Sequence, residues 1–299
     1  MAKLLLIGGT GFFGKSILDA FQRNLLLDFG VDQITIIARN KQRFLNEYSN
    51  LITHNVEIIE GDINYINLLP EADIIIYAAA STNTQDYKKN GFQELLKMKN
   101  GILNFCELIK KFGDDSKIVF CSSGAVYGKQ PISLEKIDET YPFENDLSGI
   151  SEEKIWYLQG KRFAEEQIYK LGEFNKNVSI ARCFAFSGKY LPKDQHYAIG
   201  NFIGQAEKGK NIQVEAPGVV FRSYMKADEL VKSLFQIAKV ASPKCPIFNV
   251  GSDIQISIYD LAESIAKKYN VQCEFKNLNR EIVIDRYVPN VDKLKSLFV

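Results

Sequence analysis

A glycine-rich turn close to the amino terminus constrains the fold more than any other feature of this chain. The apolar run Leu4–Ile7 leads directly into Gly-Gly-Thr-Gly-Phe-Phe-Gly at residues 8–14, and helical spacing follows over Phe13–Arg23. Glycines at this spacing allow a tight turn, the approach of a pyrophosphate to the backbone, and close packing of helix on strand. The free N–H groups at the start of the helix then face the phosphates. The pattern predicts a dinucleotide-binding unit, with an ordinary glycine-rich turn as the competing interpretation.

The alternation of strands and helices continues through the first half of the chain. Helical spacing covers Gln93–Phe112 and Ser151–Leu171. Between the helices lie short runs rich in Ile, Val and Leu, typical of parallel strands buried on both faces. These runs are Ile34–Ala38, Val56–Glu60, Ile74–Ala78, Lys117–Cys121 and Val178–Arg182. The predicted fold class is therefore α/β, a Rossmann-type doubly wound parallel sheet.

The local composition of the sequence changes after about Gly188, where prolines and glycines become frequent. Short strands then mix with helices expected at Asp228–Val240 and Ser257–Tyr269. We predict that residues 1–188 form an NAD(P)-binding Rossmann domain and that residues 189–299 form a smaller C-terminal substrate-binding lobe. Within that lobe, residues from about 223 to 250 are expected to pack back on the Rossmann domain.

Composition narrows the classes of partner. Thirty-seven basic residues stand against thirty-six acidic ones, so no basic surface for nucleic acid is expected. Five scattered cysteines without a C-x-x-C motif indicate reduced thiols, and two histidines give a zinc site no support. No apolar stretch approaches the roughly 20 residues of a membrane span. We expect a soluble, cytoplasmic protein without metal, membrane or nucleic acid.

The end of the second predicted strand indicates which dinucleotide is bound. In NAD proteins a carboxylate there binds the adenosine ribose hydroxyls, but this run ends in Ala38 and is followed by Arg39. The guanidinium of Arg39, with Lys41 or Arg43, suits a 2′-phosphate. NADP(H) is therefore predicted over NAD(H), and the competing interpretation is a solvated basic cluster at a helix start.

A tyrosine–lysine pair lies in the long helix before the sixth strand. Of fourteen tyrosines, only Tyr157 has a lysine four residues later, Lys161, which places both on one helix face. The ammonium and a positive nicotinamide ring favour the phenolate. A shift of about three pKa units, worth roughly 4 kcal/mol, would make Tyr157 a usable acid and base. Alone the motif is weak, since most such tyrosines are surface or core residues.

Two serines follow the fifth predicted strand, where the sequence reads C-S-S-G-A-V-Y-G from Cys121 to Gly128. Ligands of doubly wound sheets bind beyond the carboxyl ends of the strands. A serine there suits a hydrogen bond to a substrate oxygen held toward Tyr157. The competing interpretation of either serine is a loop hydrogen bond or a helix cap.

Together these motifs resemble the extended short-chain dehydrogenase/reductase family of NAD(P)-dependent nucleotide-sugar epimerases, dehydratases and reductases. The resemblance runs from Lys3 to about Lys295 and implies catalytic roles for Ser123, Tyr157 and Lys161. One departure is Met98, where the family often carries an asparagine of the proton relay three residues before the glycine of the fourth helix.

The resemblance also implies the cofactor contacts. Asp62 would contact the adenine, and Ala78–Ala80 would form a small-residue turn against which the cofactor lies. The implied set is Gly8, Thr10, Gly11, Phe12, Phe13, Gly14, Arg39, Asn40, Asp62, Ile63, Ala78, Ala79, Ala80, Tyr157, Lys161 and Phe184.

On the substrate side, the resemblance implies arginines that bind the diphosphate of a nucleotide sugar in a planar fork. Arg222 and Arg280 match, with Arg286 competing for the second position. His196 reads equally well as a solvated loop residue, and Ala185 replaces an asparagine that the family usually carries. The implied substrate set is Ser122, Ser123, Tyr157, His196, Asn201, Arg222 and Arg280.

The residues after the catalytic serine bear on the reaction. Dehydratases of the family usually carry Asp-Glu there, whereas Ser123 is followed by Gly124-Ala125. An epimerase commonly keeps NAD and a reductase consumes NADPH, so Arg39 favours, by analogy, NADPH-dependent reduction of a nucleotide-linked 4-keto-6-deoxysugar. The alternatives are a nucleotide-sugar 4-epimerase and a non-catalytic NADP(H)-binding scaffold or sensor. The family also leads us to expect a homodimer.

Overall fold

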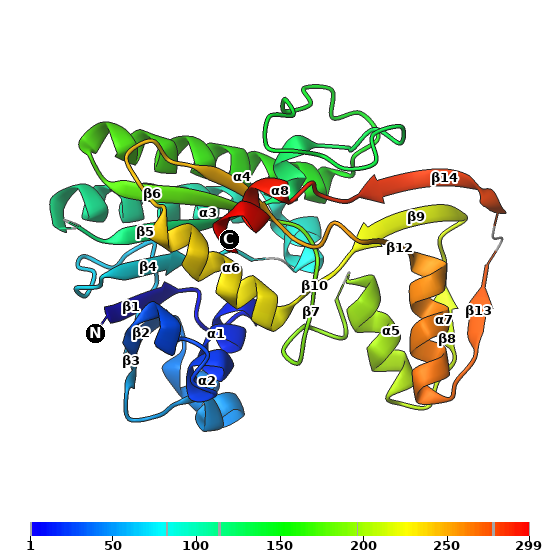
Figure 1. Ribbon diagram of the computed structural model, residues 1–299, viewed down its shortest axis with the longest axis horizontal. Coiled ribbons are helices and arrows are strands. Elements are labelled where there is room, and N and C mark those ends of the chain that lie inside the picture. Colours follow the sequence, from blue (N-terminus) through cyan, green and yellow to red (C-terminus); the bar gives the residue numbers. More distant parts are fainter. Residues whose placement is uncertain (1, 82, 113–114, 196, 277–278, 299) are drawn as a thin grey trace.

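A seven-stranded, wholly parallel sheet forms the centre of the molecule (Figure 1). The computed structural model describes residues 2–81, 83–112, 115–195, 197–276 and 279–298. In the order β11-β6-β5-β4-β1-β2-β3, the direction of winding reverses between β1 and β4, which confirms the predicted doubly wound α/β fold. The strands are β1 Ala2–Ile7, β2 Val31–Ala38, β3 Val56–Glu60, β4 Ile74–Tyr77, β5 Lys117–Ser123, β6 Asn177–Cys183 and β11 Ile247–Val250.

Helices cover both faces of this sheet, and each face has its own apolar core (Figure 1). On one side lie α1 (Phe12–Gln22), α2 (Lys41–Tyr48) and α6 (Ala227–Lys239). On the other side, α3 (Thr84–Phe112) packs beside α4 (Glu152–Leu171). Because the central strands are buried on both faces, their sequences are continuous apolar runs and do not alternate with polar residues.

Helix α3 begins nine residues before the predicted start at Gln93. Asn90 interrupts it with φ −148° and ψ 51°, and Asn and Gly are weak helix formers, so the periodic pattern fades in this first part. Gly91 lies against the Trp156 ring, where a Cβ would have no room. A Cβ at Gly160 would similarly lie 2.6 Å from Sδ of Met98. Met98, at the position of the family's relay asparagine, thus fills the contact between α3 and α4.

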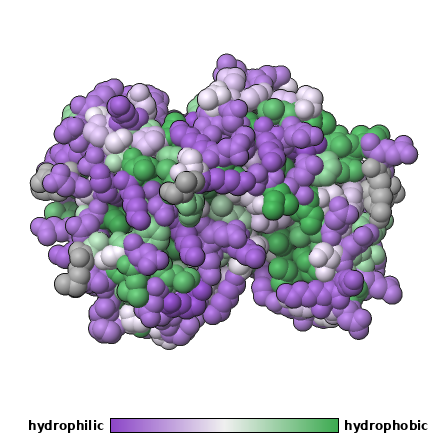
Figure 2. Space-filling view, viewed as in Figure 1, coloured by the Kyte–Doolittle hydropathy of each residue, from purple (hydrophilic) through white to green (hydrophobic). Residues whose placement is uncertain are grey.

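A smaller lobe follows the sixth strand. Its core joins Phe202, Ile212 and Ala262, and the outline of the molecule narrows between this lobe and the larger part (Figure 2). The lobe contains α5 (Ala198–Ala206), α7 (Ile258–Tyr269), the pair β8 (Ile212–Val214) and β13 (Cys273–Phe275), and the sheet β12 (Gln255–Ser257), β9 (Gly218–Ser223) and β14 (Asn279–Tyr287).

The chain does not stay in this lobe. Strand β7 (Phe186–Ser187) pairs with β10 (Met225–Lys226), α6 and β11 join the large sheet, and α8 (Asp292–Lys295) packs near β11. Single helical turns lie at Leu27–Phe29, Ser49–Leu51, Gly124–Tyr127, Gly172–Phe174 and Ser296–Phe298. In the part of the chain that the structure describes, no helix combines the length and apolarity that crossing a bilayer requires.

Candidate active site

The glycine turn between β1 and α1 is built by close backbone contacts. Gly8 has φ +92°, and a Cβ there would lie 2.6 Å from the carbonyl carbon of Ala78 and from the nitrogen of Ala79. Gly14 meets the carbonyl of Gly9 in the same way, without room for a side chain. These glycines are therefore required by the packing of the turn on the end of β4 and of α1 on the turn.

Gly11 is different, because a Cβ there would meet only the Gly8 carbonyl oxygen at an ordinary 3.5 Å. It is the N-cap of α1, and no side chain of the described residues caps this helix. A helix N-terminus with open space in front is an anion site. Thr10 is exposed beside it, whereas the rings of Phe12 and Phe13 pack near Phe186, so these two offer a phosphate only their backbone N–H groups. The turn fits a dinucleotide pyrophosphate.

Arg39 lies exposed directly after β2, beside the buried Ala38. Asn40 caps α2 by accepting a hydrogen bond of 2.8 Å from the Arg43 backbone N–H, and the Arg43 guanidinium pairs with Glu47 at 3.0 Å. Arg39 makes no ion pair within the described ranges. Of the candidate cations at this edge, Arg39 therefore has a guanidinium available for a ligand.

The other predicted cofactor contacts follow β3 and β4. Asp62 accepts from the backbone and the side chain of Asn64 at 2.9 and 2.8 Å, so its carboxylate is partly used by its own turn. Ile63 is buried at 8% exposure, and Ala79 and Ala80 are partly exposed beside the glycine turn. These residues lie at the carboxyl edge of the sheet.

The structure brings Ser123, Tyr157 and Lys161 together. Ser123 ends β5 and accepts a 3.2 Å hydrogen bond from the Ala125 backbone N–H, and its hydroxyl lies near enough to Tyr157 to act on the pKa of that phenol, which it lowers. Lys161, one turn after Tyr157, has its Nζ 5.8 Å from the centre of the Tyr157 ring. The same ammonium donates to the carbonyl of Cys121 at 2.8 Å, which fixes α4 to β5.

Burial dominates the protonation of this group. Desolvation raises the pKa of Tyr157 well above 10, with Tyr197 acting in the same direction and the Ser123 hydrogen bond opposing it. Desolvation also lowers the pKa of Lys161, while Glu165 and other neighbours act against that shift. The expected lowering of the Tyr157 pKa is therefore not present in the chain by itself, because desolvation outweighs the opposing effect of Ser123. At neutral pH Tyr157 is therefore a neutral phenol.

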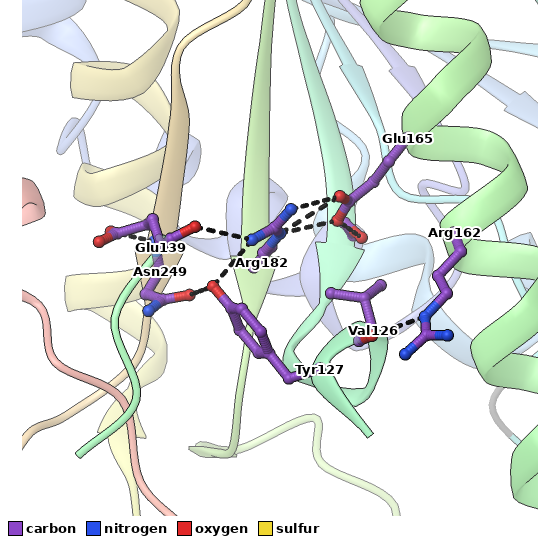
Figure 3. Close-up of polar contacts among 8 residues, drawn as sticks. Val126, Tyr127, Glu139, Arg162, Glu165, Arg182 and Asn249 are labelled. Carbon is purple, nitrogen blue, oxygen red and sulfur yellow. Dashed lines mark hydrogen bonds and ion pairs between the residues drawn. The ribbon is translucent and has the colours of Figure 1, made fainter. Parts of the chain in front are cut away.

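A polar network joins Arg182, Glu165, Tyr127 and Asn249 inside the protein (Figure 3). Arg182 on β6 and Glu165 on α4 form an ion pair of 2.8 Å with side chains 5% and 6% exposed. Arg182 also donates to the Tyr127 hydroxyl at 2.9 Å, and Tyr127 donates to Asn249 on β11 at 2.7 Å. Ser122 donates to Glu165 at 2.5 Å. The network ties β5, α4, β6 and β11 together.

Ser122, which the resemblance places in the substrate set, is thus separated from Ser123. It is 3% exposed and its hydroxyl is used by Glu165 inside the protein. Successive side chains of a strand point to opposite faces, so neighbouring serines of β5 serve different surroundings. Only Ser123 lies with Tyr157.

Of the two diphosphate arginines in the implied substrate set, Arg222 on β9 is the one whose side chain the structure describes. It donates to the Phe221 carbonyl at 2.8 Å and to the Asp285 carboxylate at 2.5 Å. Arg286 pairs in register with Phe221, and Arg222 with Tyr287, so the two guanidiniums leave opposite faces of the lobe sheet. Arg286 donates instead to Gln255 at 2.5 Å. The structure does not bring Arg286 together with Arg222.

The remaining substrate candidates are described only in part. Asn201 is partly exposed on α5. His196 and the side chain of Arg280 lie outside the described residues. Phe184 follows β6, is 9% exposed, and stacks on Tyr287 with ring centres 4.6 Å apart. Among the described residues, no three His, Cys, Asp or Glu side chains come together as metal ligands.

The comparison with protein families decides the membership of the chain. The model of the NAD dependent epimerase/dehydratase family matches residues 4–251. The chain belongs to this family. That membership confirms the predicted enzyme class, the extended short-chain dehydrogenase/reductase type.

Relatives of this epimerase/dehydratase cover nearly the whole chain. It is 28% identical to UDP-glucuronic acid decarboxylase 5 of Arabidopsis thaliana over 92% of this chain and 76% of that protein. It is 25% identical to a putative UDP-glucose 4-epimerase of Methanocaldococcus jannaschii over 98% and 92%. The fold matches the solved structure of a UDP-N-acetylglucosamine 4-epimerase from Methanobrevibacter ruminantium with a TM-score of 0.81 at 20% identity, over 100% of this chain and 92% of that one.

Two residues near the candidate site escaped the sequence reasoning. Glu165 follows Lys161 by four residues, a spacing that places it on the same face of α4 and that could have indicated a buried acid. Tyr287 comes from β14, and its hydroxyl lies beside Gly124, the residue after Ser123. Nothing in the local sequence of Tyr287 signals this approach, because it depends on the pairing of β14 with β9.

Proposed function

We propose that the protein is an NADPH-dependent ketoreductase that acts on a nucleotide-linked 4-keto-6-deoxysugar. Arg39 is the observation that carries the cofactor assignment. It is exposed and without an ion pair among the described residues, at the end of β2, where Ala38 replaces the carboxylate that NAD proteins use. The carboxylate opposite Ala38 in register, Glu60, lies 3.4 Å from the backbone nitrogen of Lys41, from which it accepts a hydrogen bond.

The relatives support the substrate class. Several are named for reactions of UDP-sugars or dTDP-sugars, and one 21% identical Arabidopsis protein has a UDP-4-keto-L-rhamnose reductase activity in its name. A solved structural neighbour is described in complex with UDP-N-acetylmuramic acid. Arg222 lies on the same face of the lobe sheet as Tyr287, whose hydroxyl lies beside Gly124, and its guanidinium suits a diphosphate.

The chain's own residues then perform the proton chemistry. A nicotinamide dinucleotide, when bound, supplies the hydride. Tyr157, protonated at neutral pH, donates its phenol proton to the substrate oxygen, and Ser123 donates a hydrogen bond to the same oxygen. Lys161 stabilises the phenolate that remains and would hold the nicotinamide ribose. The N-terminus of α1 would hold the pyrophosphate and Arg39 the 2′-phosphate.

A nucleotide-sugar 4-epimerase is the second candidate, and the names of several relatives favour it. Epimerisation uses the same serine, tyrosine and lysine in both directions of hydride transfer. Dehydration is less suited to the site, because Gly124 and Ala125 follow Ser123 where acids would be needed. A non-catalytic scaffold is disfavoured since the catalytic residues are present and assembled.

We further propose a homodimer through α3 and α4, whose outer surface exposes Phe92, Leu103 and Tyr169. The cytoplasmic location remains a proposal as well. It is supported by free cysteines, four of them buried, which suit a reducing compartment.

A turnover screen of nucleotide-linked 4-keto-6-deoxysugars with NADPH and NADH, read by mass spectrometry, tests the reaction. Stoichiometric NADPH consumption supports the reductase, whereas sugar interconversion without net cofactor use selects the epimerase. Tyr157→Phe should abolish either reaction, and full turnover by this variant would refute the mechanism.

The cofactor assignment has its own test. Arg39→Ala should weaken NADPH binding about tenfold to a hundredfold, the worth of a charge-assisted hydrogen bond, and leave NADH binding unchanged. Arg43→Ala is the matched control, because its guanidinium is already paired with Glu47. Equal losses of NADPH and NADH binding in Arg39→Ala would refute the 2′-phosphate role.

A further inference from the structure

The ring of Tyr87, from the start of α3, packs against the ring of Tyr157 in the candidate active site. The two ring centres lie 5.9 Å apart and the ring planes meet at 88°, the edge-to-face arrangement that aromatic pairs favour. Tyr87 is 5% exposed, whereas Tyr157 is partly exposed. The Tyr87 ring therefore covers part of the Tyr157 ring and leaves another part of it open to solvent.

The Tyr87 hydroxyl anchors this ring at its other end. It donates a hydrogen bond of 3.2 Å to the Ser81 carbonyl. Burial raises the pKa of Tyr87, so at neutral pH the hydroxyl keeps the proton that it donates. Ser81 directly follows Ala78–Ala80, the turn on which the dinucleotide is expected to lie. Tyr87 therefore links that turn to Tyr157.

Side-chain hydrogen bonds also fix the residue before Tyr87. The Ser81 hydroxyl donates to the Asp86 carboxylate at 2.9 Å, and the side-chain amide of Asn83 donates to the same carboxylate at 3.3 Å. These bonds hold Asp86 back toward Ser81. The position of Tyr87 is thus set by its own segment of the chain and does not depend only on the contact with Tyr157.

The interruption of α3 at Asn90 brings this segment against α4. Asn90 has non-helical dihedral angles, so the residues before it do not continue the axis of the long helix. Gly91, the next residue, lies against the Trp156 ring, where a Cβ would meet Cδ1 at 2.2 Å. Tyr87 and Gly91 therefore contact two consecutive residues of α4, Tyr157 and Trp156.

We propose that Tyr87 is a positioning residue whose ring fixes the direction of the Tyr157 hydroxyl, while its own hydroxyl ties that ring to Ser81. A tyrosine side chain turns about two single bonds, so a ring packed against it restricts where its hydroxyl can lie. The assignment rests on the proposed function in one respect, that Tyr157 donates the proton. It holds equally for a reductase and for an epimerase, because both need this hydroxyl at the substrate oxygen.

Tyr87→Leu removes the ring and is compared with Tyr87→Phe, which keeps the ring and removes only the bond to Ser81. On the nucleotide sugar that the wild type converts, Tyr87→Leu should lower kcat about tenfold to a hundredfold and change KM less than about twofold, because misplacing a reacting group by about 1 Å costs about a hundredfold in rate. Tyr87→Phe should stay within about threefold of the wild-type kcat. An unchanged kcat in Tyr87→Leu overturns the proposal. So does an equal loss in both variants, or a raised KM with kcat unchanged, since either means that Tyr87 contacts the substrate itself.

Phe105→Leu is the matched control. Phe105 also comes from α3, is fully buried and makes an edge contact with a tyrosine, Tyr77, with ring centres 4.9 Å apart. Both leucine variants should lower the melting temperature, but Phe105→Leu should leave kcat of the folded protein unchanged. A similar fall of kcat in Phe105→Leu would mean that any loosening of α3 slows turnover, which overturns the specific role of Tyr87. Tyr87→Met, with a flexible side chain that fills irregular gaps, replaces Tyr87→Leu if the latter does not fold.

A measurement without turnover separates this proposal from the proposed function. With tyrosines labelled with carbon-13 at the ring Cε positions, the Tyr157 resonances are assigned by their loss in Tyr157→Phe. The Tyr157 ring should flip faster in Tyr87→Leu than in the wild type and in Tyr87→Phe, and at the wild-type rate in Phe105→Leu. If no nucleotide sugar is converted, the proposed function fails while the flip rate still decides the role of Tyr87; an unchanged flip rate in Tyr87→Leu overturns it.

Discussion

Glu165→Gln should destabilise the protein more than any surface change of the same kind. The substitution keeps the shape of the side chain and removes the charge that faces Arg182. The two side chains are 6% and 5% exposed, and the guanidinium makes contacts of 2.8, 3.1 and 3.2 Å with the carboxylate. Figure 3 shows the Glu165 carboxylate facing the Arg182 guanidinium, which in the variant would remain buried without this counter-ion.

The structure sets the size of the effect. Removing one partner of a buried ion pair costs about 3–5 kcal/mol. Arg182 would keep two neutral acceptors, the Tyr127 hydroxyl at 2.9 Å and the Glu139 carbonyl at 3.3 Å, which favours the lower end. Ser122 can still donate to the amide oxygen of the new glutamine. We expect a loss of about 3 kcal/mol, which corresponds to a melting temperature lower by roughly 6–12 °C.

Thermal unfolding followed by circular dichroism, with urea unfolding beside it, measures this loss. Glu207→Gln is the matched control, because Glu207 pairs with Lys193 where both side chains are about two-fifths exposed, 40% and 44%. Its cost should stay below about 1 kcal/mol. Replacing both Glu165 and Arg182 by Met should cost less than Glu165→Gln, since no unpaired charge remains. If Glu165→Gln is no more destabilising than Glu207→Gln, the buried ion pair does not contribute the free energy of unfolding expected here.

Three further predictions follow from the same coordinates. Gly11→Ala should lower the free energy of unfolding by less than about 1 kcal/mol, yet bind NADP⁺ more weakly in calorimetry. Gly14→Ala, whose Cβ would meet the Gly9 carbonyl, should lower the melting temperature. A destabilised Gly11→Ala with unchanged NADP⁺ binding would contradict the pyrophosphate site. Burial raises the pKa of the Cys106 and Cys245 thiols to about 12, above the 9.0 of the unfolded chain. Their contribution to stability is therefore complete below pH 9 and is lost as the pH rises from 9 toward 12, so urea unfolding should weaken less with pH in Cys106→Ala than in the wild type. Asp285→Asn should tighten binding of UDP or TDP about tenfold. The reason is that Arg222 stays oriented by the Phe221 carbonyl while the competing carboxylate is removed. Weaker binding would mean that Asp285 orients the guanidinium.

The sheet could be predicted from the sequence because its strands are short, buried on both faces and separated by amphipathic helices. The predicted boundaries of β3, Val56–Glu60, coincide with the observed ones. Strand β11 was not singled out as a strand, since Ile247–Val250 is only four residues long and arrives after an excursion through the smaller lobe. The start of α3 was missed where Asn90 and Gly91 weaken the helical pattern.

The proximity of Ser123, Tyr157 and Lys161 could be predicted for a different reason: these residues stand in local motifs on β5 and α4. The residues around them could not be predicted, because they come from distant segments. Asn249 reaches Tyr127 across 122 positions, and Tyr287 reaches Gly124 only through the pairing of β14 with β9. The protonation of Tyr157 also escaped, because a sequence shows the ammonium four residues away but not how completely the phenol is desolvated.

The stability and the proposed chemistry of this protein depend on the same two elements, β5 and α4. On β5, Ser122 holds the buried Glu165 while Ser123 faces Tyr157; on α4, Lys161 fixes the helix to β5 through the Cys121 carbonyl. A loosened Glu165–Arg182 pair would therefore allow β5 and α4 to shift against each other, and a shift of about 1 Å costs about a hundredfold in rate. Glu165→Gln should lower the melting temperature, and at temperatures well below the unfolding transition it should also lower kcat. A purely global loss of stability would leave kcat of the folded fraction unchanged. The separation of these two outcomes decides whether the network only stabilises the fold or also sets the catalytic geometry.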